Sequence, residues 1–275
     1  MVSAVTLALL GCSEAGPEED DAPGSGAGGE AAPSDADTDD DGSEDGAGET
    51  ATTGAAAGQG GSQTTPDEPT RIVLLVPGTM ITGDYFDDMA ERLSADGFLP
   101  VIYEPPDLLT ESLASGASGI SDEIDRVLAA SGAQKLHIVA ECNGGVATRY
   151  LLQVLGGAER VDQFISFVSA HHGTWLSPVG DLTTGFTSLA EITPGSAFLA
   201  ELNAAPFPSG LHMTSIYSCN DELMLPYDTS VVSGATNVLF CDHYLGHLDG
   251  FWDSLVYERI RVTLEGQGDA APTSY

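Results

Sequence analysis

One cysteine of the chain stands where a nucleophile would stand. Cys142 follows a strand-like run at 136–140 and precedes a helical pattern at 146–155. Ala140 and Gly144, two residues before and after it, are small. A sharp strand-to-helix turn needs small residues there, exposes its central side chain and aims the next backbone N–H at a developing oxyanion. The pattern A-x-C-x-G therefore predicts a thiol nucleophile; the alternative is a buried structural cysteine.

A nucleophile of this kind needs a base, and the base needs an acid that orients it. Asp221 follows a strand-like run at 213–219, and His247 follows another at 237–241, just before the last helical pattern. The order nucleophile, acid, base is expected when each partner follows a later strand. We predict that Cys142, Asp221 and His247 form a catalytic triad.

Two neighbours compete for these roles. His243 lies closer to the end of the strand than His247, and Glu222 is adjacent to Asp221. We favour His247 as the base because the glycine before it allows the loop to place the imidazole over the nucleophile. His243 would then be a packed or hydrogen-bonded histidine.

The elements that must position these residues alternate between strands and helices. Short apolar runs predict strands, and apolar residues at helical spacing predict helices. The predicted strands are 72–76, 99–103, 136–140, 164–169, 213–219 and 237–241, and helical patterns occupy 86–93, 120–128, 146–155 and 251–264. This alternation predicts an α/β fold, with a mostly parallel central sheet and helices on both faces.

Five stretches resemble the triacylglycerol lipases and esterases of the α/β-hydrolase superfamily, in particular class 2 lipases. They are residues 75–79, 140–145, 171–174, 214–221 and 245–247. The resemblance covers about residues 71–266 and implies an α/β-hydrolase domain at 70–266. It also implies that the backbone N–H groups of Thr79 and Asn143 form the oxyanion hole.

The nucleophile position departs from the family pattern. Lipases have serine where Cys142 stands, usually after histidine rather than Glu141, whereas cysteine recurs in polyester synthases and a few lactone hydrolases of the superfamily. A helix N-terminus lowers a thiol pKa, and a nearby carboxylate would oppose that effect. We expect a carboxylic-ester hydrolase or acyltransferase that works through an acyl-enzyme. The alternative is a catalytically silent hydrolase-fold domain used for binding.

A long insertion at residues 173–211 precedes the acid strand. It is rich in large apolar residues: Trp175, Leu176, Phe186, Leu189, Ile192, Phe198, Leu199 and Phe207. Long loops in compact domains are usually functional, so we predict a cap or lid over the acyl pocket. The alternative is an ordinary excursion with its own helices. Either arrangement gives an apolar wall that suits small-molecule or lipid esters with apolar acyl chains.

The first residues predict export. Residues 9–12 resemble the lipobox of bacterial lipoproteins, which implies a signal peptide at 1–11 and lipidation of Cys12. The protein would then be a cell-envelope lipoprotein attached to the membrane only by its lipid anchor. An ordinary secretory signal, giving a secreted protein, and no export are the alternatives, because the segment has no Lys or Arg before the apolar run.

Residues 12–69 are rich in small and acidic residues and predict a disordered tether. Within it, residues 37–42 match the start of a calcium loop, but the twelfth position is Gly48 instead of a bidentate Glu. A plain acidic linker is the better interpretation. Residues 267–275 predict a flexible C-terminal tail.

Charge and cysteine content limit the possible partners. The chain has 42 acidic and 8 basic residues, a net charge of −34, which excludes the basic patches that bind nucleic acid. No His and Cys cluster has zinc spacing and no phosphate loop is found, so we expect no metal and no cofactor. We also expect a monomer. Cys219 and Cys241 end consecutive predicted strands. If these strands are neighbours, about 5 Å apart, a disulfide is within reach; two buried thiols are the alternative.

Overall fold

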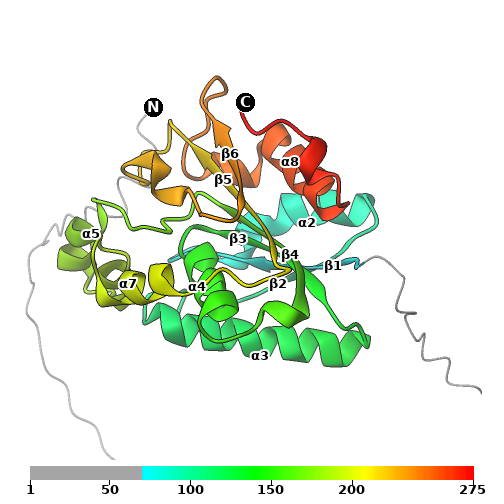
Figure 1. Cartoon of the computed structure of the whole chain (residues 1–275), viewed down its shortest axis with the longest axis horizontal. Coiled ribbons are helices and arrows are strands. Elements are labelled where there is room, and N and C mark those ends of the chain that lie inside the picture. Colours follow the sequence, from blue (N-terminus) through cyan, green and yellow to red (C-terminus); the bar gives the residue numbers. More distant parts are fainter. Residues whose placement is uncertain (1–69) are drawn as a thin grey trace, which may run out of the picture. The chain divides into compact units, whose positions relative to one another are not determined.

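A six-stranded parallel sheet forms the centre of the computed structural model, which describes residues 70–275 (Figure 1). The strands are β1 (Ile72–Val76), β2 (Leu99–Ile102), β3 (Leu136–Glu141), β4 (Val161–Phe167), β5 (His212–Ser218) and β6 (Thr236–Phe240). Their order in the sheet is β2-β1-β3-β4-β5-β6, and every neighbouring pair is parallel. Because the strands are parallel, the loops that follow them meet at one edge of the sheet.

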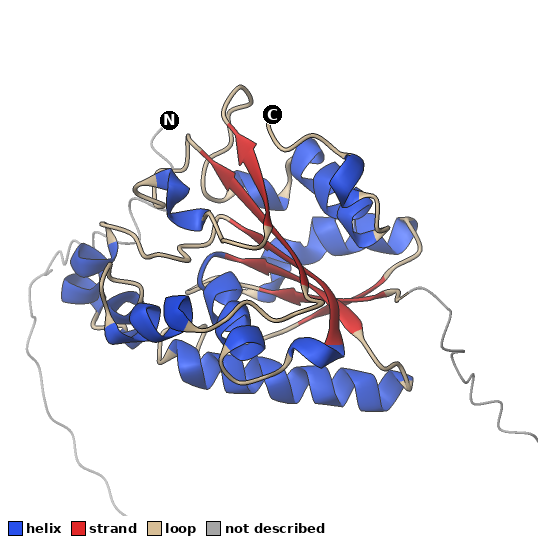
Figure 2. Cartoon of the chain, viewed as in Figure 1, coloured by secondary structure: helices blue, strands red, loops and turns tan. Residues whose placement is uncertain are grey.

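Helices cover both faces of the sheet (Figure 2). They are α2 (Asp87–Ala95), α3 (Leu113–Ser131), α4 (Cys142–Gln153), α5 (Ser177–Thr184), α6 (Thr187–Glu191), α7 (Ala197–Ala204) and α8 (Ser254–Leu264). Short 3-10 turns lie at Gly83–Phe86, Ala158–Arg160, Tyr227–Ser230, Asp249–Phe251 and Gly268–Ala270. The predicted α/β class is confirmed.

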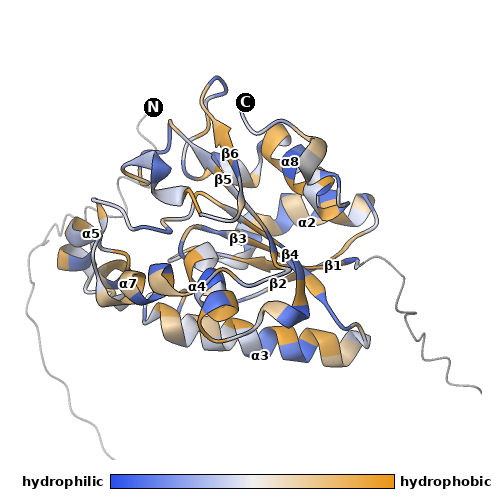
Figure 3. Cartoon of the chain, viewed as in Figure 1, coloured by the Kyte–Doolittle hydropathy of each residue, from blue (hydrophilic) through white to orange (hydrophobic). Residues whose placement is uncertain are grey.

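Alternate residues of β1 point into the two hydrophobic cores. Ile72, Leu74 and Val76 pack with α3, α4 and α7 on one face, whereas Val73 and Leu75 pack with α2 and α8 on the other. All five residues are buried, as expected for a central parallel strand. Helix α3 alternates between hydrophobic and hydrophilic residues and buries its hydrophobic side (Figure 3), whereas almost every residue of α4 is buried.

The helix after β3 starts earlier than its apolar pattern predicts. The pattern begins at Val146, but α4 begins at Cys142, directly after the strand. Gly144 and Gly145 lie in its first turn, and glycine has low helix propensity, so the sequence gives no signal for these residues. Tight packing accounts for both glycines. A Cβ at Gly144 would overlap the Pro77 carbonyl, and one at Gly145 would overlap Ser169.

The insertion at 173–211 contains α5, α6 and α7. Ile192, Leu199 and Leu202 are buried against the core on the α3 and α4 face. In contrast, Val179 and Leu182 on α5 are 60% and 87% exposed. The insertion is therefore anchored through its second half and presents an apolar side of α5 to solvent. No helix in residues 70–275 has the length and apolarity needed to cross a membrane.

The C-terminal residues differ from the flexible tail expected at 267–275. Ser274 forms a parallel bridge with Leu239 of β6, and the backbone N–H groups of Cys241 and Asp242 donate to the Tyr275 carbonyl. The Tyr275 ring stacks on Phe240 with 4.5 Å between centroids. The tail therefore covers the outer edge of the sheet, which would otherwise be an unpaired strand edge. The expected signal peptide at 1–11, the tether at 12–69 and its calcium-loop pattern lie outside the described residues.

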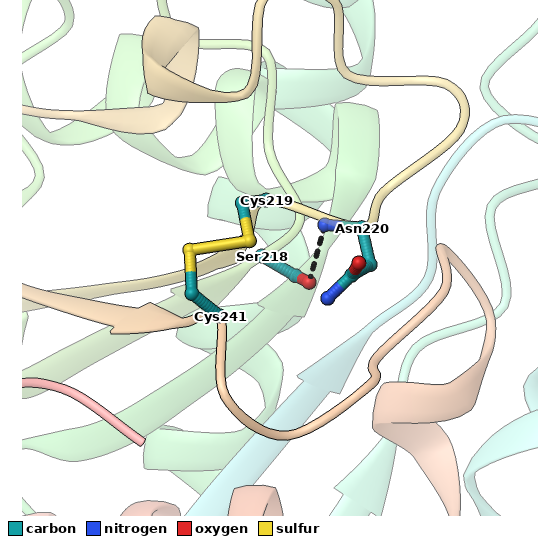
Figure 4. The surroundings of a disulfide bond; sticks show 4 residues. All are labelled: Ser218, Cys219, Asn220 and Cys241. Atoms are coloured by element: carbon teal, nitrogen blue, oxygen red, sulfur yellow. Dashed lines mark hydrogen bonds between the residues drawn. A yellow bond between two sulfur atoms is a disulfide. The ribbon is translucent and has the colours of Figure 1, made fainter.

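A disulfide joins the ends of β5 and β6 (Figure 4). Cys219 and Cys241 have Cα atoms 5.2 Å apart and lie 22 residues apart in the chain. Asn220, next to Cys219, donates its backbone N–H to the Ser218 hydroxyl at 3.0 Å. The bridge therefore holds the segment that leads into Asp221.

Removal of this bridge is expected to destabilise the protein. A Cys219→Ser/Cys241→Ser protein should lose about 2–4 kcal/mol of unfolding free energy, because the bridge restricts the unfolded chain. Denaturant unfolding of this variant, of wild type and of Cys142→Ser as a thiol control measures the difference. Peptide mapping without reductant should show Cys219 linked to Cys241; free thiols at both positions would contradict the pairing.

Candidate active site

The turn between β3 and α4 presents Cys142. Its backbone φ is +48°, an uncommon value for a residue other than glycine. The loop after β1 approaches this turn closely, since a Cβ at Gly78 would lie 2.7 Å from the Cys142 Cβ. The thiol is half-buried at the N-terminal end of a helix. This strained strand-to-helix turn has the form of a nucleophile elbow.

Two side chains from later loops, His247 and Asp221, lie on the same side of the sheet edge as Cys142. A ring nitrogen of His247 lies within 4.8 Å of the Cys142 sulfur. On its other side, Nδ1–H of His247 donates to the Asp221 carboxylate, with distances of 3.1 and 3.0 Å to Oδ1 and Oδ2. Asp221 is itself fixed, because Oδ1 accepts the backbone N–H groups of Leu223 and Met224 at 2.8 and 3.0 Å. The three predicted triad residues therefore meet in the predicted order.

The competing residues have other partners. His243 bonds through Nε2 to Asp253 at 2.6 Å, and Asp253 caps the N-terminus of α8. Glu222 accepts the backbone N–H of His247 at 3.0 Å, so it supports the loop of the base but does not contact the ring nitrogens. Neither residue orients the imidazole.

Thr79 and Asn143 lie beside the thiol and line the same pocket as Cys142. Their side chains hold the loop after β1 against α4. Asn143 Nδ2 donates to the Thr79 hydroxyl at 2.8 Å, and that hydroxyl donates to the Leu109 carbonyl at 2.8 Å. The backbone N–H of Asn143 has a lowering effect on the pKa of the Cys142 thiol. These contacts fix the two residues expected to stabilise an oxyanion.

Glu141 was expected only to oppose the lowering of the thiol pKa, and its contacts in the site were not predicted. It ends β3, is fully buried, and its Oε2 accepts the Gly78 backbone N–H at 2.9 Å. Its Oε1 lies 3.3 Å from Nε2 of His247 and has no hydrogen-bond partner among the residues described. A charged residue at the end of a mostly apolar strand was the signal in the sequence.

Burial and charge shift the pKa values of the reacting pair. Burial raises the pKa of the Cys142 thiol and the Glu141 charge raises it further, against a lowering effect of His247. Burial alone would lower the pKa of His247. The Asp221 charge and the adjacent Cys142 outweigh burial, so the pKa of His247 lies well above its usual value. The raised pKa of His247 makes the imidazole a better acceptor for the thiol proton, so the thiol is activated through the imidazole.

Comparison with known proteins gives a curated relative. Lipase B of Pseudozyma antarctica is 30% identical over 225 residues, which cover 75% of this chain and 66% of that protein. The chain belongs to the lipase and esterase family of α/β-hydrolases. It spans about two thirds of the length of this relative. No family model matches the sequence.

Solved structures agree with the fold of this lipase-family member. The mature Bacillus licheniformis lipase BlEst2 superposes with a TM-score of 0.62 at 14% identity, covering 73% of this chain and 94% of that one. Aspergillus fumigatus lipase B has a TM-score of 0.56 at 18% identity and covers 71% of this chain and 52% of its own. The predicted α/β-hydrolase fold is confirmed.

The lipase-family domain has an apolar pocket of about 340 Å³ that contains Cys142 and His247. The insertion forms one wall with Leu176, Phe186, Leu189 and Ile192, and Ile81, Leu223 and Leu248 contribute elsewhere. The predicted site residues Cys142, His247, Thr79 and Asn143 line this pocket, and Asp221 lies behind His247. Cys219 and Cys241 lie in the disulfide, and Cys12 lies outside the described residues.

Proposed function

We propose that the chain is a carboxylic-ester hydrolase or acyltransferase with a Cys142–His247–Asp221 triad. The observation that supports this most strongly is the position of His247, which hydrogen-bonds to the Asp221 carboxylate through Nδ1 and has a ring nitrogen within 4.8 Å of the Cys142 sulfur. The relative and the solved structures carry lipase names, which supports ester substrates.

Each residue has a defined role in the proposed reaction. His247 Nε2 takes the thiol proton as the Cys142 sulfur attacks the ester carbonyl carbon. The Thr79 and Asn143 backbone N–H groups stabilise the resulting oxyanion. When the carbon–oxygen bond breaks, His247 returns the proton to the departing alcohol and a thioester remains. Water then attacks in hydrolysis, or an alcohol in acyl transfer, with His247 again as the base.

The pocket points to apolar acyl groups. Aliphatic and aromatic side chains make up most of its walls, and the insertion lines the same pocket as the thiol. Burial of an acyl chain there gains about 0.8 kcal/mol per CH₂ group. We therefore take residues 173–211 as a cap over the acyl site.

Trapping of the acyl-enzyme tests the proposal. Wild type is incubated with p-nitrophenyl esters of short and long acyl chains, and its mass is measured before and after quenching. We expect p-nitrophenol release together with a mass increase of one acyl group on the Cys142 peptide. If no ester in a broad panel is cleaved and none acylates the protein, the silent binding domain is the correct interpretation.

The location of the protein follows from the lipobox-like residues 9–12. We propose that the mature N-terminus is a lipidated Cys12, with residues 12–69 as the tether between the anchor and the enzyme. Mass spectrometry of the N-terminal peptide from a bacterial host should show a diacylglyceryl group on Cys12. An unmodified Cys12 peptide from soluble protein would contradict the anchor.

A further inference from the structure

Three different metal-binding groups converge beside the nucleophile. One ligand atom each of Glu141, Cys142 and His247 lies within 4.8 Å of the other two. The groups are a carboxylate oxygen, a sulfur and an imidazole nitrogen, the three ligand types that Zn²⁺ uses in proteins. Bond lengths of about 2.0–2.3 Å from a shared Zn²⁺ place such atoms about 3–4 Å apart, so the side chains need only small movements.

The surrounding contacts already orient these groups as they are oriented in zinc sites. Nδ1–H of His247 is bound by Asp221, which leaves Nε2 to face the sulfur and Glu141. A carboxylate that fixes a histidine in this way is the usual outer partner of a zinc-bound imidazole. The Gly78 N–H fixes Oε2 of Glu141 and directs Oε1 toward Nε2, 3.3 Å away.

The burial of Glu141 is a second observation that indicates a bound cation, separate from the convergence of the three groups. Its side chain is fully buried, and Oε1 accepts no hydrogen bond within residues 70–275; its ionic contact there is with Nε2 of His247, another member of the cluster, 3.3 Å away. An unsatisfied buried carboxylate oxygen is costly, and a coordinated cation is one of the few groups that satisfies it. The ester reaction proposed above does not use this atom.

We propose that Glu141, Cys142 and His247 bind one Zn²⁺ ion, which blocks the thiol. Three protein ligands and an open fourth position form the common arrangement of accessible zinc sites. The fourth position faces the pocket, because all three residues line it. The sulfur and imidazole ligands favour Zn²⁺ over Mg²⁺ and Ca²⁺, which prefer oxygen ligands. Inhibition of the ester reaction rests on the proposed function, whereas zinc binding does not.

Binding is measured on the full-length protein, without thiol reductant. Calorimetry with Zn²⁺ should show one tight site, and titration with Co²⁺ should produce the near-ultraviolet charge-transfer band of a thiolate ligand. Glu141→Gln keeps the size of the side chain and should weaken zinc binding at least about tenfold. Cys142→Ser should lose the cobalt band. His243→Ala is the matched control, since His243 bonds to Asp253 on the surface and should leave binding unchanged.

A second measurement follows the thiol itself. Zn²⁺ should slow alkylation of Cys142 by iodoacetamide in wild type, EDTA should reverse the protection, and Glu141→Gln should need at least about tenfold more Zn²⁺ for the same protection. Circular dichroism confirms that each variant is folded. The proposal is overturned if wild type gives no thiolate–cobalt band, or if folded Glu141→Gln binds zinc as tightly as wild type. Neither measurement depends on ester turnover, so a protein without esterase activity can still pass or fail this test.

Discussion

Replacement of the nucleophile is expected to abolish ester turnover in Cys142→Ala and to leave the fold intact. Alanine keeps the Cβ that the turn already accommodates at φ +48°, so the backbone need not change. The variant has no sulfur to attack the acyl carbon. Loss of a triad nucleophile costs at least about a thousandfold in kcat. Kinetics on a p-nitrophenyl ester, together with thermal unfolding and circular dichroism, separate this chemical loss from unfolding.

Cys142→Ser is the matched variant for this test. Serine retains an oxygen nucleophile that needs the imidazole base more than a thiol does. Iodoacetamide should inactivate wild type, whereas any turnover that Cys142→Ser retains should be insensitive to the reagent. The disulfide leaves Cys142 as the free cysteine among the described residues, so the labelled peptide should contain it. Ester cleavage by Cys142→Ala at the wild-type rate would show that another group is the nucleophile.

The strands of the sheet could be predicted from the sequence because short apolar runs mark them locally. The run at 72–76 is apolar throughout, and such a run is buried whichever face it presents. The parallel direction followed from the helices between the strands. Once the strands are parallel, the segments after β3, β5 and β6 must meet at one edge, which is why residues 79 positions apart, at 142 and 221, could be paired in advance.

The contacts of Glu141 could not be predicted, because its partners come from distant parts of the chain. The Gly78 N–H that holds Oε2 lies 63 residues before it, and His247 belongs to the last loop. Sequence spacing says nothing about the rotamer that brings Oε1 to 3.3 Å from Nε2. The C-terminal pairing at Ser274 was missed for a related reason, since a short polar segment has no pattern of its own and gains its order from β6.

The two histidines of the last loop provide the test with the clearest contrast. His247→Ala is expected to lose nearly as much activity as Cys142→Ala, because His247 is the imidazole that Asp221 orients beside the thiol. The double variant Cys142→Ala/His247→Ala should be no slower than either single variant, since triad members act as one unit. Initial rates at saturating ester for the three proteins give this comparison.

His243→Ala should keep most of the activity. His243 is part of a half-exposed pair with Asp253, whose Oδ1 still accepts the Leu255 and Val256 N–H groups without the histidine. Exposed pairs of this kind contribute about 0–1 kcal/mol, so the variant should lose at most about 1 kcal/mol of unfolding free energy. Spacing along the chain did not separate the two histidines, but the Asp253 and Asp221 contacts do. If His243→Ala is as inactive as His247→Ala while remaining folded, the base is wrongly assigned and the line from Asp221 to Cys142 is not the catalytic one.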